Sequence, residues 1–527
     1  MKKKVVVVER ISDKGVEILK NAPGLEVDVK FDIPREELLK IIPEYDAIVV
    51  RSVTKVNEEF YEHATNLKVV GRAGNGVDNI QMEGATKRGI IVVNTPESNV
   101  VSAAEHTIGL MLASARNTVR AHKMIESRVW ERKDLKGTEL FHKTLGIIGL
   151  GRIGKLVTKR MQAFGMTIIA YDPYIPDAIF KNYGVKKCET LDELLKESDV
   201  ITIHTPKTEE TINMLGAAEF AKCKKGVRLV NCARGGLYNE KELAEAIKSG
   251  QVASLGLDVL ADEPKPISPL IDLPQCVLTP HLGADTAEAQ DNVGIAIAEE
   301  VIDALNGKMV PNAVNLPALH AQELNTVVPY LNLGENMGKI YYQMNKDAVN
   351  KVEVAYHGTV AEMETSLVTR AILKGIFEPV LKERINVVNA ELAAANQGVE
   401  VVESKVTGDD KSNGILVTIH SAKGIFTVGG TVLAEVGHIT EVAGYHFDLV
   451  PAKNTIIATN EDKPGVIGQI GTILGASHVN IATMQVSKSD KNKQAMMFLT
   501  VDSEVNKETI KMIEGIDGMN SAHFIKF

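Results

Sequence analysis

Short runs of β-branched and other apolar residues alternate with helical patterns through the first part of the chain. The runs fall at residues 5–8, 26–31, 47–51, 68–73 and 90–94. Alternation of this kind is typical of a parallel sheet whose strands are connected by crossover helices. The pattern therefore predicts an α/β unit at the start of the chain.

A long helical pattern at residues 102–117 separates this unit from a second series of apolar runs. These runs lie at residues 144–148, 167–171, 200–205, 227–233, 254–259 and 276–280, and they predict a second parallel sheet. An Ala-rich amphipathic segment follows at residues 285–306. The Pro-bounded stretch 311–317 is then interpreted as a linker.

The C-terminal part of the chain is organised differently. Residues 455–527 read as strand, helix, strand, strand, helix and strand, an order that predicts a ferredoxin-like α+β module. Residues 318–450 show helical patterning near 363–381 and hairpin-like strands such as 426–432, but no motif that carries chemistry.

Length and composition agree with several soluble globular domains. The chain has 527 residues, which favours three or four domains, and 44% of them are apolar and 24% charged. The net charge is −9 without long like-charge runs, so no nucleic-acid or membrane-surface partner is expected. No stretch approaches the roughly 18 uninterrupted apolar residues of a membrane span.

The cysteines indicate a reducing environment. Cys188, Cys223, Cys232 and Cys276 show no CxxC spacing and are too few to staple a chain of this length. We therefore expect no disulfide framework and no metal site, and we predict a cytoplasmic protein.

A dinucleotide-binding pattern opens the second α/β unit. The predicted strand at residues 144–148 runs into Gly149-Leu150-Gly151-Arg152-Ile153-Gly154 and then into a helix, and Asp172 closes the next strand. Glycines at these positions allow a tight turn and close approach to a pyrophosphate, while the acid accepts from the ribose hydroxyls. Because no Arg or Lys directly follows Asp172, NAD is predicted rather than NADP.

Three further segments carry a family resemblance. Residues 229–236 (LVNCARGG), residues 256–264 (GLDVLADEP) and residues 279–283 (TPHLG) resemble the D-2-hydroxyacid dehydrogenase family in order and spacing, over about residues 1–315. The resemblance implies that Arg234, Glu263 and His281 form the catalytic set. It also implies that Thr205, Pro206, Ala233 and Asp258 line the cofactor.

The chemistry of these residue types agrees with that role. A hydride transfer from a secondary alcohol needs a base for the hydroxyl proton, and a histidine such as His281 titrates in the right range. Glu263 would orient the ring and favour its protonated form, and Arg234 would hold a carboxylate with its planar guanidinium. Each residue taken alone could also be structural, and His204 is interpreted as structural.

Two N-terminal segments indicate an anionic substrate. Arg51-Ser52 and the run Arg72-Ala73-Gly74-Asn75-Gly76 each follow a predicted strand. Together they offer arginine side chains for a phosphate and the backbone N–H groups of residues 74–76 for a carboxylate. Alternatively, the two arginines only pair with surface acids. The same segments resemble the phosphoglycerate dehydrogenases of the family, which implies 3-phosphoglycerate as the substrate.

The C-terminal module carries its own resemblance. Residues 459–468 (TNEDKPGVIG), with Asn480 at the next strand start, resemble the ACT domains of amino-acid-regulated enzymes. That resemblance implies an effector site of Asn460, Asp462 and Asn480 between two modules, with L-serine as the ligand. The alternative is that Pro464-Gly465 only starts a helix and the module only dimerises.

Trp130, the only tryptophan, has two interpretations. The resemblance implies a subunit contact, with Arg132 near the neighbour's site, in a homodimer or homotetramer. A core position is nearly as plausible.

The whole reading predicts four domains. A flavodoxin-like substrate domain (1–97 and 285–315) would contain an inserted Rossmann-type NAD domain (98–284). An intervening regulatory α+β domain (318–450) and an ACT domain (455–527) would follow. Two rival functions stay open, a glyoxylate or hydroxypyruvate reductase and an NAD-sensing regulator without enzymatic activity.

Overall fold

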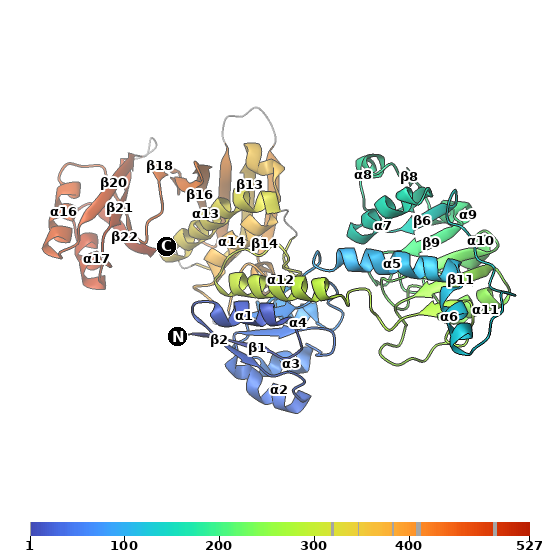
Figure 1. Ribbon diagram of the computed structural model, residues 1–527. Helices are drawn as coiled ribbons and strands as arrows, with labels where there is room; N and C mark the ends of the chain where they lie inside the picture. The colour runs from blue at the N-terminus through green and yellow to red at the C-terminus, as the bar shows by residue number, and fades with distance from the viewer. Residues whose placement is uncertain (1, 318–320, 346, 382–383, 407–412, 489–492) are drawn as a thin grey trace.

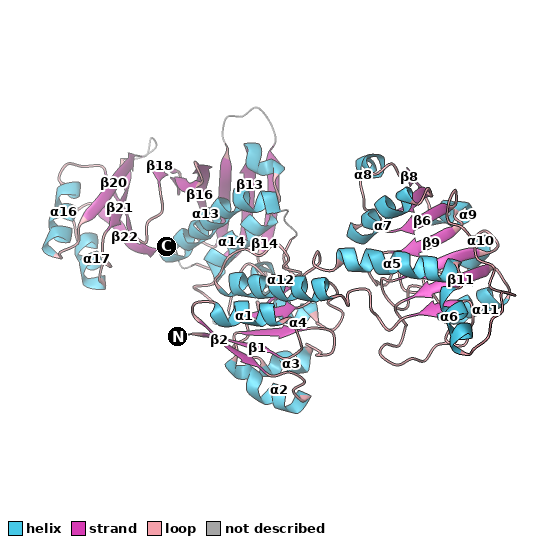
Figure 2. Ribbon diagram, in the orientation of Figure 1, coloured by secondary structure: helices cyan, strands magenta, loops and turns pink. Residues whose placement is uncertain are grey.

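The computed structural model describes residues 2–317, 321–345, 347–381, 384–406, 413–488 and 493–527, and it contains four sheets (Figures 1 and 2). Two of these are parallel and belong to the N-terminal half of the chain, whereas the other two are mainly antiparallel. The predicted α/β class with a C-terminal ferredoxin-like module is confirmed. Among the described helices, none is both long and apolar enough to cross a membrane.

The first sheet has five parallel strands in the order β2-β1-β3-β4-β5, the flavodoxin-like order. Its strands are β1 (Lys3–Val7), β2 (Leu25–Val29), β3 (Ala47–Val50), β4 (Val69–Arg72) and β5 (Ile91–Val93). The helices beside it are α1 (Asp13–Asn21), α2 (Arg35–Ile41), α3 (Glu58–His63), α4 (Met82–Lys87) and the much later α12 (Ala287–Leu305), with a short 3₁₀ turn at Ile42–Glu44. Apolar clusters cover both sheet faces, as expected for buried parallel strands.

The segment interpreted as a linker is in fact fixed to this first sheet. Ala313 forms an antiparallel bridge with Val93, and the N–H of Val314 donates to the carbonyl of Val92 at 2.7 Å. The side chain of Asn315 donates to the carbonyl of Ile90 at 2.8 Å. Pro-bounded composition indicates irregular backbone, but it does not reveal that the backbone extends a sheet edge.

The second sheet has seven strands in the order β12-β11-β10-β9-β6-β7-β8, and its pairings are parallel. The strands are β6 (Thr144–Ile148), β7 (Thr167–Tyr171), β8 (Lys186–Lys187), β9 (Val200–Ile203), β10 (Val227–Asn231), β11 (Val252–Leu257) and β12 (Cys276–Leu278). Its helices are α5 (Val100–Ala115), α6 (Thr118–Glu126), α7 (Arg152–Ala163), α8 (Asp177–Asn182), α9 (Leu191–Glu197), α10 (Ala217–Lys222) and α11 (Glu240–Lys248). The carboxyl ends of its strands, where ligands bind in such sheets, carry the segments singled out from the sequence.

The third sheet belongs to the intervening region and has the order β14-β13-β15-β16-β17-β18. It consists of β13 (Val349–His357), β14 (Glu400–Val406), β15 (Gly414–Ser421), β16 (Gly424–Leu433), β17 (Val436–Val442) and β18 (Tyr445–Leu449). Helices α13 (Ala321–Asn345), α14 (Ser366–Phe377) and α15 (Ala390–Asn396), with a 3₁₀ turn at Gly358–Glu362, complete this region.

Helix α13 was absent from the sequence interpretation, and its composition explains why. It contains Pro329, Gly334 and Gly338, residues that count against a helix. The glycines allow a close crossing with α14, because a Cβ on Gly338 would lie 2.3 Å from the carbonyl oxygen of Ile372. Tertiary packing therefore outweighs the weak helix propensity.

The fourth sheet is the ferredoxin-like module, in the order β20-β21-β19-β22. Its elements are β19 (Asn454–Glu461), α16 (Val466–Ala476), β20 (Ile481–Lys488), β21 (Gln494–Val501), α17 (Lys507–Glu514) and β22 (Met519–Lys526). One set of its apolar side chains belongs to the same buried cluster as the intervening region: Ile457, Met496, Phe498 and Ile525. The module and the intervening region thus share a core.

A loop of the intervening region also holds the first sheet. Nη1 of Arg384 donates to the carbonyl of Leu67 at 3.0 Å, and Nδ2 of Asn386 donates to the carbonyl of Gly89 at 2.7 Å. Leu67 and Gly89 lie just before β4 and β5, at the amino ends of these strands. Arg72 and its glycine-rich loop lie at the carboxyl end of β4.

Candidate active site

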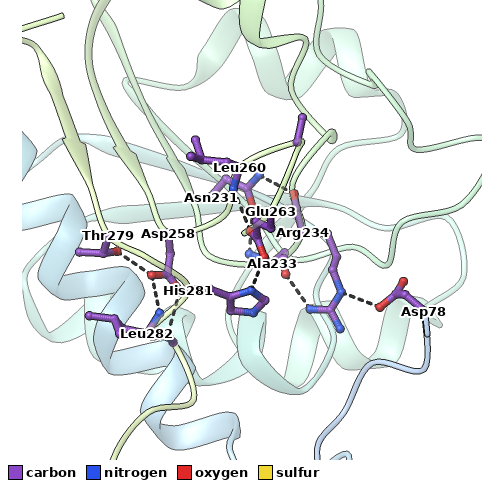
Figure 3. A network of polar contacts seen from close by, with 12 residues as sticks. Asp78, Asn231, Ala233, Arg234, Asp258, Leu260, Glu263, Thr279, His281 and Leu282 are labelled. Atoms are coloured by element: carbon purple, nitrogen blue, oxygen red, sulfur yellow. Dashed lines mark hydrogen bonds and ion pairs between the residues drawn. The ribbon is translucent and has the colours of Figure 1, made fainter. Parts of the chain in front are cut away.

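Loops after three neighbouring strands bring together the residues predicted to be catalytic (Figure 3). Arg234 follows β10, Glu263 follows β11 and His281 follows β12. Because these strands are parallel, their carboxyl ends meet at one edge of the sheet. The three side chains come from separate loops, so their convergence is a property of the fold.

His281 and Glu263 form a hydrogen-bonded pair. Nδ1 of His281 lies 2.7 Å from Oε2 of Glu263, and Oε1 of Glu263 accepts from the N–H of Leu260 at 2.9 Å. The hydrogen bond to the carboxylate raises the pKa of His281 above its ordinary value of 6.5, although partial burial opposes the rise. The imidazole is 48% exposed, which leaves Nε2 available to a bound molecule.

Asp258 fixes the loop that carries His281. Its side chain is fully buried, and Oδ1 accepts from the hydroxyl of Thr279 at 2.6 Å and from the N–H of Leu282 at 2.8 Å. Oδ2 accepts from the N–H of Gly283 at 2.8 Å, and Nε2 of His106 lies 3.1 Å from Oδ1. All these partners belong to the chain itself, so Asp258 has a structural role. The further prediction that Asp258 lines the cofactor stays a prediction.

Arg234 is held from both sheets. Nη1 donates to the carbonyl of Ala233 at 2.7 Å, and Nε lies 3.4 Å from Oδ2 of Asp78, which follows β4 of the first sheet. The side chain of Asn231 accepts from the N–H of Ala233 at 2.8 Å and donates to the carbonyl of Arg234 at 2.9 Å. This turn at the end of β10 directs the guanidinium toward the first domain.

The glycine-rich loop has the geometry of a dinucleotide cradle. Gly149 adopts φ 91°, and a Cβ there would lie 2.8 Å from the carbonyl oxygen of His204. A Cβ on Gly154 would lie 2.4 Å from the carbonyl oxygen of Gly149, whereas Gly151 faces open space. Gly151 also begins α7 without a side-chain cap, so the first N–H groups of that helix can bind an anion.

Arg152 and Ile153 form the first turn of α7. Nε of Arg152 lies 3.3 Å from Oε1 of Glu97, a residue in the segment before α5, and the Arg152 side chain is exposed. Ile153 is half-buried against the core of the second sheet.

Asp172 and Thr205 border the same loop. Oδ2 of Asp172 accepts from the N–H of Leu150 at 2.9 Å, and Oδ1 accepts from the N–H of Tyr174 at 3.0 Å. The hydroxyl of Thr205 is buried with no hydrogen-bond partner among the described residues, as a polar group awaiting a ligand would be. Pro206 is exposed beside it. These features fit a dinucleotide.

His204 is half-buried with its Nδ1 enclosed, and desolvation lowers its pKa to about 4, so it is neutral near pH 7. The structural role expected for it stays a prediction.

Three arginines form a cationic cluster across the cleft. Burial and, to a smaller extent, the nearby charges of Arg234 and Arg51 together lower the pKa of Arg72 to about 10. Nη1 of Arg72 donates to the carbonyl of Ala73 at 3.0 Å, and its buried Nε has no partner among the described residues. Nη1 of Arg51 donates to the carbonyl of Arg10 at 3.2 Å, and Ser52 is exposed beside it. No carboxylate in the described part of the chain lies within ion-pair distance of Arg72.

The sequence predicted that all three N–H groups of residues 74–76 are free to bind a carboxylate, and one of them is not. The N–H of Gly74 donates to the hydroxyl of Thr95 at 2.9 Å, so it is not free for a carboxylate. Asn75 uses its carbonyl to accept from Asn94 at 2.6 Å, and no described partner occupies the N–H of Asn75 or Gly76. The two donors beside Arg234 are therefore those of residues 75 and 76.

The three effector residues expected in the C-terminal module do not meet within one chain. Asn460 and Asp462 lie where β19 ends, and Oδ2 of Asp462 is 2.7 Å from Nζ of Lys488. Asn480 precedes β20 at the opposite end of the sheet, where its N–H donates to Oδ1 of Asp502 at 3.1 Å and its carbonyl accepts from the N–H of Asp502 at 3.2 Å. Oδ1 of Asn460 is buried without a described partner. The length of β20 (Ile481–Lys488) therefore separates Asn480 from the other two residues.

Trp130 is 81% exposed, which excludes the core position. Val129 and Ile125 beside it are also exposed, and α6 contributes no buried residue. This apolar surface is the kind that a subunit contact covers.

Several positioning residues were missed from the sequence. Asn231, His106, Thr95 and Asp78 act through hydrogen bonds or an ion pair with the predicted residues. Single polar residues of this kind leave no pattern in one sequence. Asn231 lies inside the quoted segment 229–236 and Asp78 lies two residues after the quoted glycine-rich run, which was the only available signal.

Three protein-family models match separate segments of the chain. Residues 108–283 match the NAD-binding domain of D-isomer-specific 2-hydroxyacid dehydrogenases. Residues 326–442 match the intervening domain of D-3-phosphoglycerate dehydrogenase, and residues 454–518 match the ACT domain. The NAD-binding match agrees with the glycine cradle described above.

Curated relatives match along their full length. The D-3-phosphoglycerate dehydrogenase of Archaeoglobus fulgidus is 44% identical, covering 99% of this chain and 100% of its own. That of Bacillus subtilis is 39% identical, covering 99% of both chains.

A solved glyoxylate reductase from Paecilomyes thermophila is 30% identical with a TM-score of 0.55, but it covers only 59% of this chain and 98% of its own. The apo D-lactate dehydrogenase of Escherichia coli is 27% identical with a TM-score of 0.53, covering 59% and 99%. The catalytic half is therefore common to many dehydrogenases, and the remainder distinguishes this chain. The chain belongs to the D-3-phosphoglycerate dehydrogenase family of NAD-dependent D-isomer-specific 2-hydroxyacid dehydrogenases.

Proposed function

We propose that this protein oxidises 3-phosphoglycerate to 3-phosphohydroxypyruvate with NAD, the first committed step toward L-serine. One observation carries the choice of substrate: the cluster of Arg51, Arg72 and Arg234 opposite the His281–Glu263 pair. A substrate with a carboxylate at one end and a phosphate at the other matches such a cluster. The full-length relatives support the same substrate.

The residues divide the work as follows. Arg234 and the N–H groups of Asn75 and Gly76 bind the substrate carboxylate, while Arg51 and Arg72 bind the phosphate. Nε2 of His281 accepts the proton of the C2 hydroxyl as the C2–O bond becomes a carbonyl, and Glu263 stabilises the resulting imidazolium. When bound, NAD supplies the nicotinamide ring that accepts the hydride from C2.

The cofactor is held by the cradle around α7. The N–H groups that follow Gly151 bind the pyrophosphate, and Asp172 accepts from the adenosine ribose. Thr205 offers its unpartnered hydroxyl to the same ligand.

We also propose regulation by L-serine at an interface between two C-terminal modules, in a homodimer or homotetramer. The opposite positions of Asp462 and Asn480 support a site that two copies complete. The exposed surface around Trp130 supports a second subunit contact near the catalytic half.

The direct experiment is a substrate panel. The purified protein should oxidise 3-phosphoglycerate with NAD far faster than D-glycerate or glycolate, and it should reduce glyoxylate poorly with NADH. A preference for glyoxylate or glycolate would contradict the proposal. Calorimetric titration of the full-length protein with L-serine should release or absorb heat, and Asp462→Ala should abolish that signal without changing turnover.

A further inference from the structure

Asp78 and Arg234 form an ion pair that joins the two α/β domains (Figure 3). Asp78 lies in the loop after β4 of the first sheet, and Arg234 lies in the loop after β10 of the second. Both loops lie at the carboxyl ends of the parallel strands in their sheets. The pair therefore joins the two domains at the place where substrate and cofactor meet.

This ion pair leaves one edge of the Arg234 guanidinium free. Nε faces Oδ2 of Asp78 at 3.4 Å, and Nη1 donates to the carbonyl of Ala233 at 2.7 Å. Nη2 has no partner among the described residues and lies against Gly76, where a Cβ would come within 2.0 Å of it. Asp78 and Ala233 thus direct Nη2 toward the unoccupied N–H groups of Asn75 and Gly76.

The two carboxylates near the arginine cluster have different partners. Glu9 and Asp78 are the two carboxylates whose charges act on Arg72. Glu9 is occupied by the N–H groups of Val53 at 3.1 Å and Thr54 at 2.8 Å, so it holds the 51–54 loop. The Asp78 side chain is 63% exposed and has Arg234 as its ion-pair partner. Asp78 thus places a largely exposed carboxylate beside the arginine cluster.

We propose that Asp78 is the positioning residue of Arg234 and that its charge limits how tightly the cluster holds anions. The inference rests on the proposed function, because Arg234 must bind the substrate carboxylate. By holding Nε, Asp78 keeps Nη2 in line with the carboxylate. By remaining charged beside three arginines, it weakens their affinity for the phosphorylated product, which must leave after each turnover.

The experiment compares Asp78→Ala with Asp78→Asn. Without its ion-pair partner, Arg234 can rotate, so Asp78→Ala should lower kcat about tenfold. Asp78→Asn keeps a side-chain oxygen and should restore part of kcat. Both variants remove the charge, so inorganic phosphate should inhibit both at concentrations about threefold lower than the wild type at low ionic strength.

Two readouts separate this role from damage to the fold. The dissociation constant for NADH, followed by its fluorescence, and the thermal midpoint should stay at wild-type values. Protection against heat by inorganic phosphate should increase in both variants, and this measurement needs no turnover. The control is Asp32→Asn, which removes the carboxylate of an exposed pair with Arg10 at 4.0 Å and should change nothing.

The outcomes are distinguishable. A wild-type protein that does not oxidise 3-phosphoglycerate contradicts the proposed function. Unchanged kcat in Asp78→Ala, or weaker phosphate binding in both variants, contradicts the role of Asp78 alone. A kcat for Asp78→Asn as low as that for Asp78→Ala contradicts positioning through the acceptor oxygen.

Discussion

Nδ1 of His281 lies 2.7 Å from Oε2 of Glu263, and the second oxygen of Glu263 is anchored by the N–H of Leu260. The anchored carboxylate stabilises the imidazolium and raises the pKa of His281 above 6.5. Oxidation of the hydroxyl needs the unprotonated ring, so kcat/KM for oxidation should rise with pH through this raised pKa. Reduction needs the protonated ring and should fall over the same range.

Replacing Glu263 by Gln tests this relationship. Loss of the carboxylate removes the main cause of the raised pKa, so the acid limb of the oxidation profile should move to lower pH, by about one unit. The height of the profile should also fall, and His281→Ala should lower kcat by about 100-fold or more. Binding of NADH should change little in either variant. A profile for Glu263→Gln that coincides with the wild type would exclude control by Glu263.

The arginine cluster predicts discrimination by phosphate. Arg51→Ala or Arg72→Ala should raise KM for 3-phosphoglycerate about tenfold or more, because a charge-assisted hydrogen bond contributes about 1.5–3 kcal/mol. KM for unphosphorylated D-glycerate should change much less. Lys87→Ala removes an exposed cation paired with Glu83 in the same domain and serves as the control. Equal effects on both substrates would assign the two arginines to the fold alone.

Asp172 predicts the choice of cofactor. Its charge should repel the 2′-phosphate of NADP, so the wild type should use NADP poorly. Asp172→Asn keeps one acceptor oxygen for the loop and loses the charge, so it should narrow the preference by improving KM for NADP. Asp177→Asn, in an exposed pair with Lys187, is the control. Steady-state kinetics with both cofactors measure the ratio, and equal use of both by the wild type would contradict the role of Asp172.

Asp258 predicts a stability effect. Both oxygens of its fully buried carboxylate accept hydrogen bonds, from Thr279, Leu282 and Gly283. In Asp258→Asn an N–H₂ group replaces one of these oxygens, so a donor faces another donor. Such a buried mismatch costs about 2–4 kcal/mol, and the thermal midpoint of the catalytic half should fall. Turnover should fall as well because the loop carries His281. Calorimetry that finds an unchanged midpoint would show that the network contributes little.

The shared core predicts where the chain tolerates truncation. A chain that ends at residue 452 loses Ile457, Met496, Phe498 and Ile525 from the core of the intervening region. It should expose apolar surface, bind the dye ANS and aggregate. A chain that ends at residue 316 keeps both parallel sheets with their own clusters and should stay monodisperse. Size-exclusion chromatography of the two chains measures this, and a well-behaved chain 1–452 would contradict it.

The sequence was informative where a pattern repeats or a motif is dense. Buried parallel strands are recognisable as apolar runs in the sequence. The glycine spacing of residues 149–154, between a strand and a helix, is typical of a dinucleotide-binding loop. The order of strands in each parallel sheet agrees with the predicted class. The nature of the catalytic loops was also recognisable, because several unusual residues occur together in them.

The sequence was silent where structure depends on partners distant in the chain. The hydroxyl of Thr95 occupies the N–H of Gly74, and no spacing rule connects them. Helix α13 survives Pro329 because its glycines allow close packing on α14. The distance between Asp462 and Asn480 follows from strand register, which a list of elements does not specify.

The loop containing Arg384 and Asn386 has a mechanical consequence. Its side chains donate hydrogen bonds to the carbonyls of Leu67 and Gly89, just before the first residues of β4 and β5. Strand β4 has four residues, so it is only about 13 Å long, and it is buried on both faces. So short and enclosed a strand is a rigid element, with Arg384 of the intervening region bonded near one end and Arg72 at the other. A displacement of the loop that contains Arg384 and Asn386 would therefore reach Arg72 through β4, a route from the intervening region to the proposed substrate site that needs no contact with the substrate itself.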